Sequence, residues 1–187
     1  MIIYEYTNKM YIARQDLRQI RRIIVADYRE TVDYILGIPL FAQKIGKENL
    51  SSLLCRLGNP EKAIPAVHVA GTNGKGSTCR ALAQMLTGMG YRVGLFTSPH
   101  LVSINERIQI DGENISDADF VWAFETVKEK FTQHPSFFEV MFAMAAVYFR
   151  EKKCDFVVYE TGMGGRLDAT NVLMPELSII TSVGMDH

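Results

Sequence analysis

The protein has 187 residues, of which 48% are apolar and 22% charged, with 20 basic against 21 acidic side chains. This is the composition of a globular domain with a real core, which argues against extended disorder and low-complexity arrays. The net charge of −1 argues against a dedicated nucleic-acid-binding protein. No apolar run approaches the roughly 18 residues that a membrane helix requires, so we expect no membrane association.

The number and spacing of the cysteines and the sequence of the first 30 residues indicate the cellular location. Cys55, Cys79 and Cys154 are odd in number and form no C-x-x-C pair, which favours free thiols over a disulfide scaffold or a zinc site. The first 30 residues lack the apolar core of a secretion signal. Both observations lead us to expect a cytoplasmic protein.

The N-terminal segment differs in charge from the rest of the chain. Residues 1–30 sum to +2, whereas residues 31–187 sum to −3. Apolar residues between positions 17 and 24 fall at helical spacing, so this segment can form a short amphipathic helix. We therefore divide the chain into an N-terminal appendage, residues 1–30, and one main domain, residues 31–187.

The main domain is predicted to begin with helices. Residues 31–57 are expected to form two short helices, separated at Gly37-Ile38-Pro39, and the second has a core face of leucines. The sequence Gly58-Asn59-Pro60 ends the second helix, because glycine and proline do not continue one.

From residue 66 onward, apolar strands alternate with amphipathic helices. Strands of the buried type are predicted over residues 66–70, 93–97, 156–159 and 177–181. A helix is predicted over residues 77–89, followed by Gly90 as its left-handed cap. Its core-facing stripe is predicted to consist of Ala81, Leu82, Met85, Leu86 and Met89.

Two further patterns complete the fold prediction. Residues 107–112 are predicted to form a hairpin at the sheet edge. Two later helices are marked by the Ser-x-x-acid spacing of a capping box, at Ser116 with Asp119 and at Ser136 with Glu139. The alternation predicts an α/β fold, with a three-layer, P-loop-type, mostly parallel sheet that has helices on both faces.

The strongest functional motif is Gly-Thr-Asn-Gly-Lys-Gly-Ser-Thr, residues 71–78, between a predicted strand and a predicted helix. Its glycines allow a tight turn that points consecutive N–H groups inward, and the helix start and Lys75 supply positive charge for phosphates. A neighbouring hydroxyl can reach a magnesium ion. The alternative is a glycine-rich turn that binds nothing, but the strand–loop–helix context favours a nucleotide phosphate.

Other predicted strands also end at residues whose side chains could bind a ligand or a metal ion. In an open parallel sheet the carboxyl ends of the strands meet at one edge, so these residues should converge on the phosphate loop. Glu160 ends a buried strand, the position from which ATPases hold magnesium. Ser98 and His187 follow two other strands and become candidates only in combination with Glu160 and the loop.

A second glycine-rich segment follows Glu160 directly. Residues 162–165 contain three glycines, which allow a ligand to approach the backbone closely, and Arg166 or Asp168 could orient that ligand. A flexible connection to the next strand is an equally open interpretation.

Several other polar residues have simpler structural interpretations. Glu139 with Ser136 needs no role beyond helix capping. His68 and His134 are expected to be structural or exposed, and Cys79 to be a small core residue.

Together these motifs resemble the N-terminal ATPase domain of the folylpolyglutamate synthase/dihydrofolate synthase family, amide ligases of the Mur type. The resemblance covers residues 28–187. Gly76 after Lys75 favours the folate branch, because peptidoglycan Mur ligases usually have Thr or Ser there. The motifs that carry the resemblance are His68–Ser77, Thr97–Leu101, Phe138-Glu139, Glu160–Asn171 and Thr181–His187.

The resemblance implies specific site residues. The ATP phosphates would be held by Thr72, Asn73, Gly74, Lys75, Gly76 and Ser77. The magnesium ligands would be Ser98, Glu160 and His187, and the catalytic residues Lys75, Glu160 and His187. The pterin-bearing substrate would contact Ser136, Phe138, Glu139, Arg166, Leu167, Asp168 and Ala169.

The implied chemistry is that of an ATP- and Mg²⁺-dependent acid–amino-acid ligase. The γ-phosphoryl group of ATP is transferred to a carboxylate of folate or dihydropteroate, and the amine of L-glutamate then attacks the acyl phosphate. Lys75 and magnesium would offset the charge on the transferring group. The partners are therefore small molecules, and the full-length family member is expected to be monomeric.

Length is the main departure from the family. Its members are more than twice as long, so residues 31–187 would be the N-terminal part of the ligase domain, and we expect the chain alone to be inactive in ligation. Residues 1–27 have no clear counterpart. The alternatives are a P-loop kinase or hydrolase, disfavoured because Gly76 separates Lys75 from Ser77, and a non-catalytic nucleotide-binding fragment.

Overall fold

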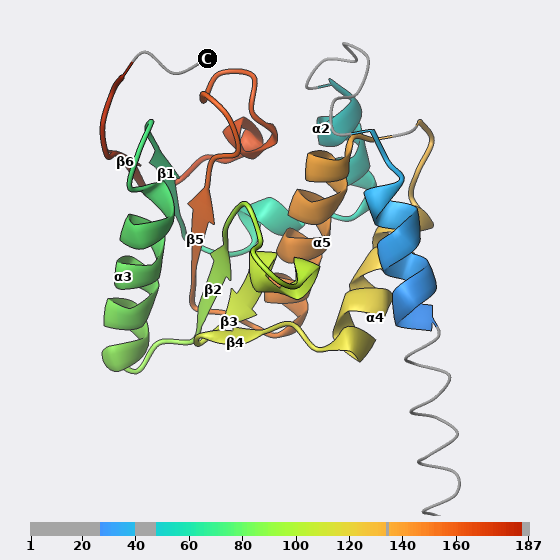
Figure 1. The fold of residues 1–187 in the computed structure, drawn as a ribbon, viewed down its shortest axis with the longest axis horizontal. Helices are drawn as coiled ribbons and strands as arrows, with labels where there is room; N and C mark the ends of the chain where they lie inside the picture. The colour runs from blue at the N-terminus through green and yellow to red at the C-terminus, as the bar shows by residue number, and fades with distance from the viewer. Residues whose placement is uncertain (1–26, 40–47, 134, 185–187) are drawn as a thin grey trace, which may run out of the picture.

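A computed structural model describes residues 27–39, 48–133 and 135–184 (Figure 1). Six strands form one sheet in the order β4-β3-β2-β5-β1-β6. The strands are β1 (Ala66–Ala70), β2 (Val93–Phe96), β3 (Ile108–Ile110), β4 (Glu113–Asn114), β5 (Phe156–Glu160) and β6 (Leu177–Ile180). The main helices are α2 (Glu48–Arg56), α3 (Lys75–Gly88), α4 (Asp117–Lys128) and α5 (Phe137–Glu151), with short 3₁₀ turns η1 (Pro60–Lys62), η2 (Ile104–Arg107) and η3 (Ala169–Val172).

The central strands are parallel. β5 pairs with β1 and β2, and β6 pairs with β1, all in parallel, whereas β3 and β4 form an antiparallel hairpin at one edge. In the hairpin turn Asp111 and Gly112 both have positive φ, of 54° and 86°, as a tight two-residue turn requires. The predicted mostly parallel sheet and its edge hairpin are confirmed.

Local signals in the sequence also position the helix ends. Ser116 and Ser136 accept hydrogen bonds from the backbone N–H of the third residue of α4 and α5 respectively, and the Ser136 N–H donates in return to the Glu139 carboxylate, which completes a capping box. Gly90 follows α3 with a φ of 92°. The predicted N-caps, the capping box at Ser136 and the left-handed Gly90 are confirmed, whereas at Ser116 the Asp119 carboxylate accepts from the serine hydroxyl at 3.0 Å and not from the backbone N–H that a capping box uses.

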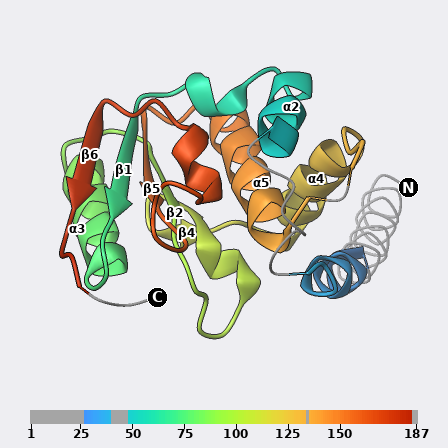
Figure 2. The same cartoon turned by 90° about the horizontal axis from the view of Figure 1, so that it is seen from above.

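The sheet is covered on both faces, as the view from above shows (Figure 2). α3 lies on one face, where Cys79 and Ala83 pack against Val69 and Val158 of the sheet. α5 lies on the other face, with α4 and α2 outside it. The predicted three-layer α/β architecture is therefore confirmed.

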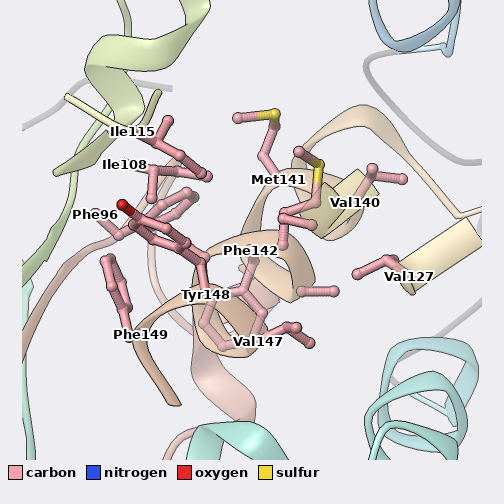
Figure 3. Close-up of a cluster of buried hydrophobic side chains, with 14 of the residues drawn as sticks. Phe96, Ile108, Ile115, Val127, Val140, Met141, Phe142, Val147, Tyr148 and Phe149 are labelled. Atoms are coloured by element: carbon pink, nitrogen blue, oxygen red, sulfur yellow. The ribbon is translucent and has the colours of Figure 1, made fainter. Parts of the chain in front are cut away.

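α5 is the centre of the larger core. The helix lies between the sheet and the outer helices, and residues 139–149 are all buried. A helix in such a position has apolar side chains on every side. Phe142 packs on Phe96 and Tyr159 with ring centroids 6.1 Å and 5.4 Å away, and Phe149 packs on Tyr159 at 6.1 Å. Figure 3 shows part of this cluster. Burial strongly raises the pKa of the Tyr159 hydroxyl.

The predicted core-facing stripe of α3 is partly wrong. Leu82 and Leu86 do contact the core, but Ala81 is exposed, and Met85 and Met89 are 66% and 70% exposed. The face that meets the sheet is rotated toward Cys79 and Ala83, because small residues let the helix approach the strands closely.

β6 also differs from its prediction as a buried strand. In the part of the chain that the structure describes it pairs with β1 alone, and Leu177 and Ile180 are 51% and 67% exposed. Within the described ranges no strand covers its other side, so β6 forms an open edge.

The beginning of the chain is described only in part. Residues 27–36 are helical, across the predicted boundary at residue 30, and Tyr28 packs edge-on against Phe120 of α4 at 5.6 Å. Most of the predicted appendage lies outside the described residues, so that division remains a prediction. None of the helices in the described ranges has the length and apolarity to cross a membrane.

The packing of β2 against α5 makes a stability prediction. A Cβ added at Gly94 would lie 2.7 Å from the Phe149 ring, which is wedged in the core. We expect Gly94→Ala to destabilise the fold by about 1–3 kcal/mol through overpacking. Urea unfolding measures this change. Gly88→Ala is the matched control, because nothing lies within 4 Å of its Cβ, and it should leave stability unchanged or slightly raised. Equal urea midpoints for Gly94→Ala and Gly88→Ala would contradict the close packing of Gly94 against Phe149.

Candidate active site

The carboxyl ends of four parallel strands lie at one edge of the sheet. β1 leads into residues 71–74 and α3, and β2 leads into Thr97 and Ser98. β5 ends at Glu160 before the glycine-rich segment, and β6 leads into residues 181–184. The loops that follow β1, β5 and β6 lie together at the upper end of the sheet in Figure 1. The predicted convergence of strand ends is therefore present.

The phosphate loop has the backbone that its sequence predicts. Gly71 and Gly74 have φ values of 132° and 82°, in the region that favours glycine. Gly74 is the N-cap of α3, and it offers no side chain to cap the helix. The first N–H groups of α3 therefore face outward with the positive end of the helix dipole, the arrangement that binds anions.

Lys75 lies across this loop. Its Nζ donates hydrogen bonds to the carbonyl oxygens of Gly71 at 2.8 Å and Thr72 at 3.2 Å. The ammonium group is thus held over the turn by two neutral acceptors. Phosphate oxygens carry full charge and would form stronger bonds with it.

The segment after β6 binds the phosphate loop from the other side. The Thr72 N–H donates to the Ser182 carbonyl at 2.9 Å, and the Asn73 N–H donates to the Ser182 hydroxyl at 3.0 Å. The Thr181 hydroxyl donates to the Asn73 carbonyl at 2.7 Å, and the Gly184 N–H to the Thr72 hydroxyl at 3.0 Å. Of the six predicted phosphate-binding residues, Thr72 and Asn73 therefore use their amides within the protein. The amides of residues 74–77 stand at the start of α3.

Glu160 is the buried acid beside the loop. It is 3% exposed, and its Oε2 accepts a hydrogen bond from the Ser98 N–H at 2.9 Å. Its Oε1 lies 3.5 Å from the place where a Cβ of Gly76 would be. Burial raises the pKa of Glu160, while the Ser98 hydrogen bond and the nearby Lys75 charge act in the opposite direction. The structure thus brings Glu160, Ser98 and the phosphate loop together.

The donor set around Glu160 fits a magnesium ion. A carboxylate and a serine hydroxyl are hard oxygen ligands, and Mg²⁺ is usually bound by one or two carboxylates together with substrate phosphates. No group of three or more His, Cys, Asp or Glu side chains that could hold a metal occurs among the described residues. The third predicted ligand, His187, lies outside them.

Arg107 and His100 were not predicted as site residues. Arg107 is 8% exposed, stacks over the Phe137 ring at 5.1 Å, and donates from Nε to His100 Nδ1 at 2.8 Å. Burial lowers the pKa of Arg107, and the Glu160 charge opposes this shift. A buried cation thus lies near the buried acid. No local pattern marks Arg107 as a site residue, and its predicted place in the edge hairpin is wrong, because it is the last residue of η2 and β3 begins at Ile108.

Asp168 holds the glycine-rich segment in shape. Its Oδ2 accepts the N–H groups of Gly162 at 2.8 Å and Met163 at 2.9 Å, and its Oδ1 accepts the N–H and the hydroxyl of Thr170. Both oxygens of this buried carboxylate are therefore engaged with the chain itself. This segment is an ordered turn, which disfavours its interpretation as a merely flexible connection.

The remaining predicted substrate residues lie around that turn or at the start of α5. Phe138 borders the turn, since a Cβ at Gly162 would lie 2.8 Å from its ring. Ser136 and Glu139 form the capping box of α5, with the Ser136 N–H donating to the Glu139 carboxylate at 2.7 Å. Both have structural partners that account for their burial. The solvent-facing members are Arg166, which is exposed, and Leu167, which is 86% exposed, whereas Ala169 is half-buried against the core.

The sequence and fold of this chain are similar to those of known proteins. The family model described as the Mur ligase middle domain matches residues 69–187, more than half of the chain. The chain belongs to the Mur ligase family. The dihydrofolate synthase/folylpolyglutamate synthase of Bacillus subtilis (strain 168) is 46% identical to it over 168 residues, covering 86% of this chain and 39% of that protein.

Solved structures agree in sequence and fold. Mycobacterium tuberculosis folylpolyglutamate synthase complexed with ADP has a TM-score of 0.82 at 35% identity, covering 88% of this chain and 38% of that one. An FPGS–AMPPCP–folate complex has a TM-score of 0.82 at 41% identity, covering 86% and 41%. The resemblance expected from the motifs is confirmed. The chain spans about two fifths of the length of these relatives.

The buried position of Glu160 makes a prediction about stability. A carboxyl whose pKa is raised on folding favours the folded state below its unfolded pKa, and that contribution is lost as the pH rises through the folded pKa. Glu160→Gln keeps an acceptor for the Ser98 N–H without the buried charge. We expect it to raise the thermal unfolding midpoint at pH 7.5 by about 1–3 °C.

Differential scanning calorimetry at several pH values measures this effect. The difference between Glu160→Gln and the wild type should shrink toward pH 4, where the wild-type carboxyl is protonated. Glu176→Gln, at an exposed glutamate, is the control and should show no such trend. A Glu160→Gln variant less stable than the wild type at pH 7.5 would contradict the assignment.

Proposed function

We propose that this chain is the nucleotide-binding part of an ATP-dependent ligase that joins L-glutamate to the carboxylate of a folate, with dihydropteroate as a second acceptor. The observation that carries the proposal is the meeting of the phosphate loop, Glu160 and Ser98 at one sheet edge, beside the ordered turn at residues 162–168. The similarity to folylpolyglutamate synthases supports the same reaction.

In this proposal the phosphates of ATP lie against the N–H groups of residues 74–77. Thr72 and Asn73 shape the loop through their bonds to residues 181–184. Lys75 turns its ammonium group from the loop carbonyls to the outer phosphates. Positive charge from the helix start and Lys75 offsets the negative charge of the triphosphate. The relatives solved with ADP and AMPPCP support this assignment.

We further propose that Ser98, Glu160 and His187 hold Mg²⁺. The ion would neutralise charge on the phosphate oxygens. Glu160 is suited to this role because its carboxylate is buried beside Gly76, where a divalent cation would relieve the unfavourable burial of its charge.

The acceptor is proposed to lie along the turn at residues 162–168 and near Phe138. Nothing lies within 4 Å of a Cβ placed at Gly164 or Gly165, so the backbone there is open to a flat ring, and Leu167 presents an apolar side chain to solvent. In the reaction a carboxylate oxygen of the acceptor attacks the γ-phosphorus and ADP leaves. The glutamate amine then attacks the acyl carbon, and inorganic phosphate leaves. The cytoplasmic location and the monomeric state of the intact enzyme remain predictions.

Nucleotide binding tests the first part of the proposal. We expect isothermal titration calorimetry to show that AMPPCP binds the chain more tightly with Mg²⁺ than without it. Lys75→Ala should weaken this binding by about tenfold or more, because it removes a full charge at the phosphates. Lys130→Ala, at an exposed lysine, is the matched control and should bind like the wild type. Equal affinities for both variants would refute the phosphate site.

Folate binding tests the second part. Leu167 is 86% exposed, so Leu167→Ala should fold normally yet lower the affinity for folate in the presence of AMPPCP by about fivefold or more. Met174→Ala is the control, because Met174 is equally exposed, at 88%, and lies outside the proposed site. Fluorescence titration measures both affinities. An unchanged folate affinity in Leu167→Ala would place the acceptor elsewhere.

A further inference from the structure

His68 lies on β1, three residues before the phosphate loop, and is bonded to a distant part of the chain. Its Nε2 is 2.7 Å from the hydroxyl oxygen of Thr170, which is 102 residues away in sequence. His68 is half-buried, and Thr170, on η3, is fully buried. A polar contact in such a place forms in the absence of competing water, so it is strong when made and unfavourable when left unmade.

The direction of this hydrogen bond follows from its neighbours. The Thr170 hydroxyl has a single proton, and it donates that proton to the carboxylate of Asp168, which can only accept. The Thr170 oxygen is therefore an acceptor toward His68, and the imidazole carries a proton on Nε2. Donation from His68 polarises the hydroxyl and strengthens its bond to Asp168.

The same carboxylate then reaches the glycine-rich turn. Oδ2 of Asp168 accepts the N–H groups of Gly162 and Met163, the first two residues after Thr161. A continuous series of hydrogen bonds thus runs from His68 through Thr170 and Asp168 to the start of the turn. It joins the strand that carries the phosphate loop to the segment proposed to bind the acceptor.

We propose that His68 is a positioning residue, which fixes the glycine-rich turn relative to the phosphate loop through Thr170 and Asp168. This role is a structural one, as expected for His68, and it has a consequence for the site. Without the imidazole donor the buried Thr170 oxygen loses a partner, and Asp168 holds the turn less firmly. The consequence for the acceptor rests on the proposed function, whereas the ordering of the turn does not.

The direct test is amide hydrogen exchange of Gly162 and Met163, followed by NMR in the chain without ligand. His68→Leu fills the space but removes the donor, and exchange at these two amides should become about fivefold faster or more. His68→Gln should restore slow exchange, because its amide nitrogen reaches the position of Nε2. Thr170→Val and Thr170→Ser form a second pair, in which only valine should accelerate exchange.

One control and one replacement variant complete this test. Val67→Ala loosens the opposite face of β1, where Val67 packs near α3, and it should not selectively accelerate the two amides. If His68→Leu does not fold, His68→Asn replaces it, because the shorter amide cannot reach Thr170. The proposal would be overturned if His68→Leu or His68→Asn left the exchange of the two amides unchanged. It would also be overturned if His68→Gln accelerated their exchange as much as the variant that lacks the donor.

A second measurement separates this proposal from the proposed function. Where the wild type binds folate, the variants that lack the donor should lose about fivefold or more in folate affinity while AMPPCP affinity changes less than about twofold, since fewer molecules have the turn in its binding-competent form. A wild type that binds no folate would count against the proposed function alone. The exchange data would still decide the role of His68.

Discussion

The parallel alignment of β2, β5, β1 and β6 is the constraint on which the site depends. Because these strands point the same way, one sheet edge receives the phosphate loop, Ser98, Glu160 and residues 181–184. Their closeness places a buried carboxylate beside the positive start of α3 and Lys75. Burial disfavours the charged form of the Glu160 carboxylate and raises its pKa, and the nearby positive charge of Lys75 opposes this shift. The positive charge of Lys75 and the start of α3 thus favours an anionic nucleotide, and the negative charge of Glu160 favours a cation.

The loops at this edge are held to one another as well as to the sheet. The phosphate loop is bonded to residues 181–184, and the glycine-rich turn is bonded through Asp168 and Thr170 to His68 of β1. The two connections therefore meet at β1 and the loop that follows it. Such bonding fixes the position of the glycine-rich turn relative to the phosphate loop. It explains why short glycine-rich segments here need not be mobile.

Local patterns predicted most of the fold and the phosphate loop. Glycine spacing, the caps at Ser116 and Ser136, and alternating apolar runs are properties of neighbouring residues, so a single sequence reveals them. Contacts between distant residues were missed. The burial of Arg107 depends on Phe137 and His100, and the role of His68 depends on Thr170. The stripe of α3 was misjudged because apolar spacing does not show which side of a helix meets the sheet.

The most direct test of the site is a crystal structure of the chain grown with AMPPCP and Mn²⁺, whose anomalous scattering locates the ion. The account predicts phosphates against the N–H groups of residues 74–77, and an ion at about 2.1 Å from oxygens of Glu160 and Ser98. A nucleotide bound away from the start of α3, or an ion that contacts the phosphates without Glu160, would contradict it.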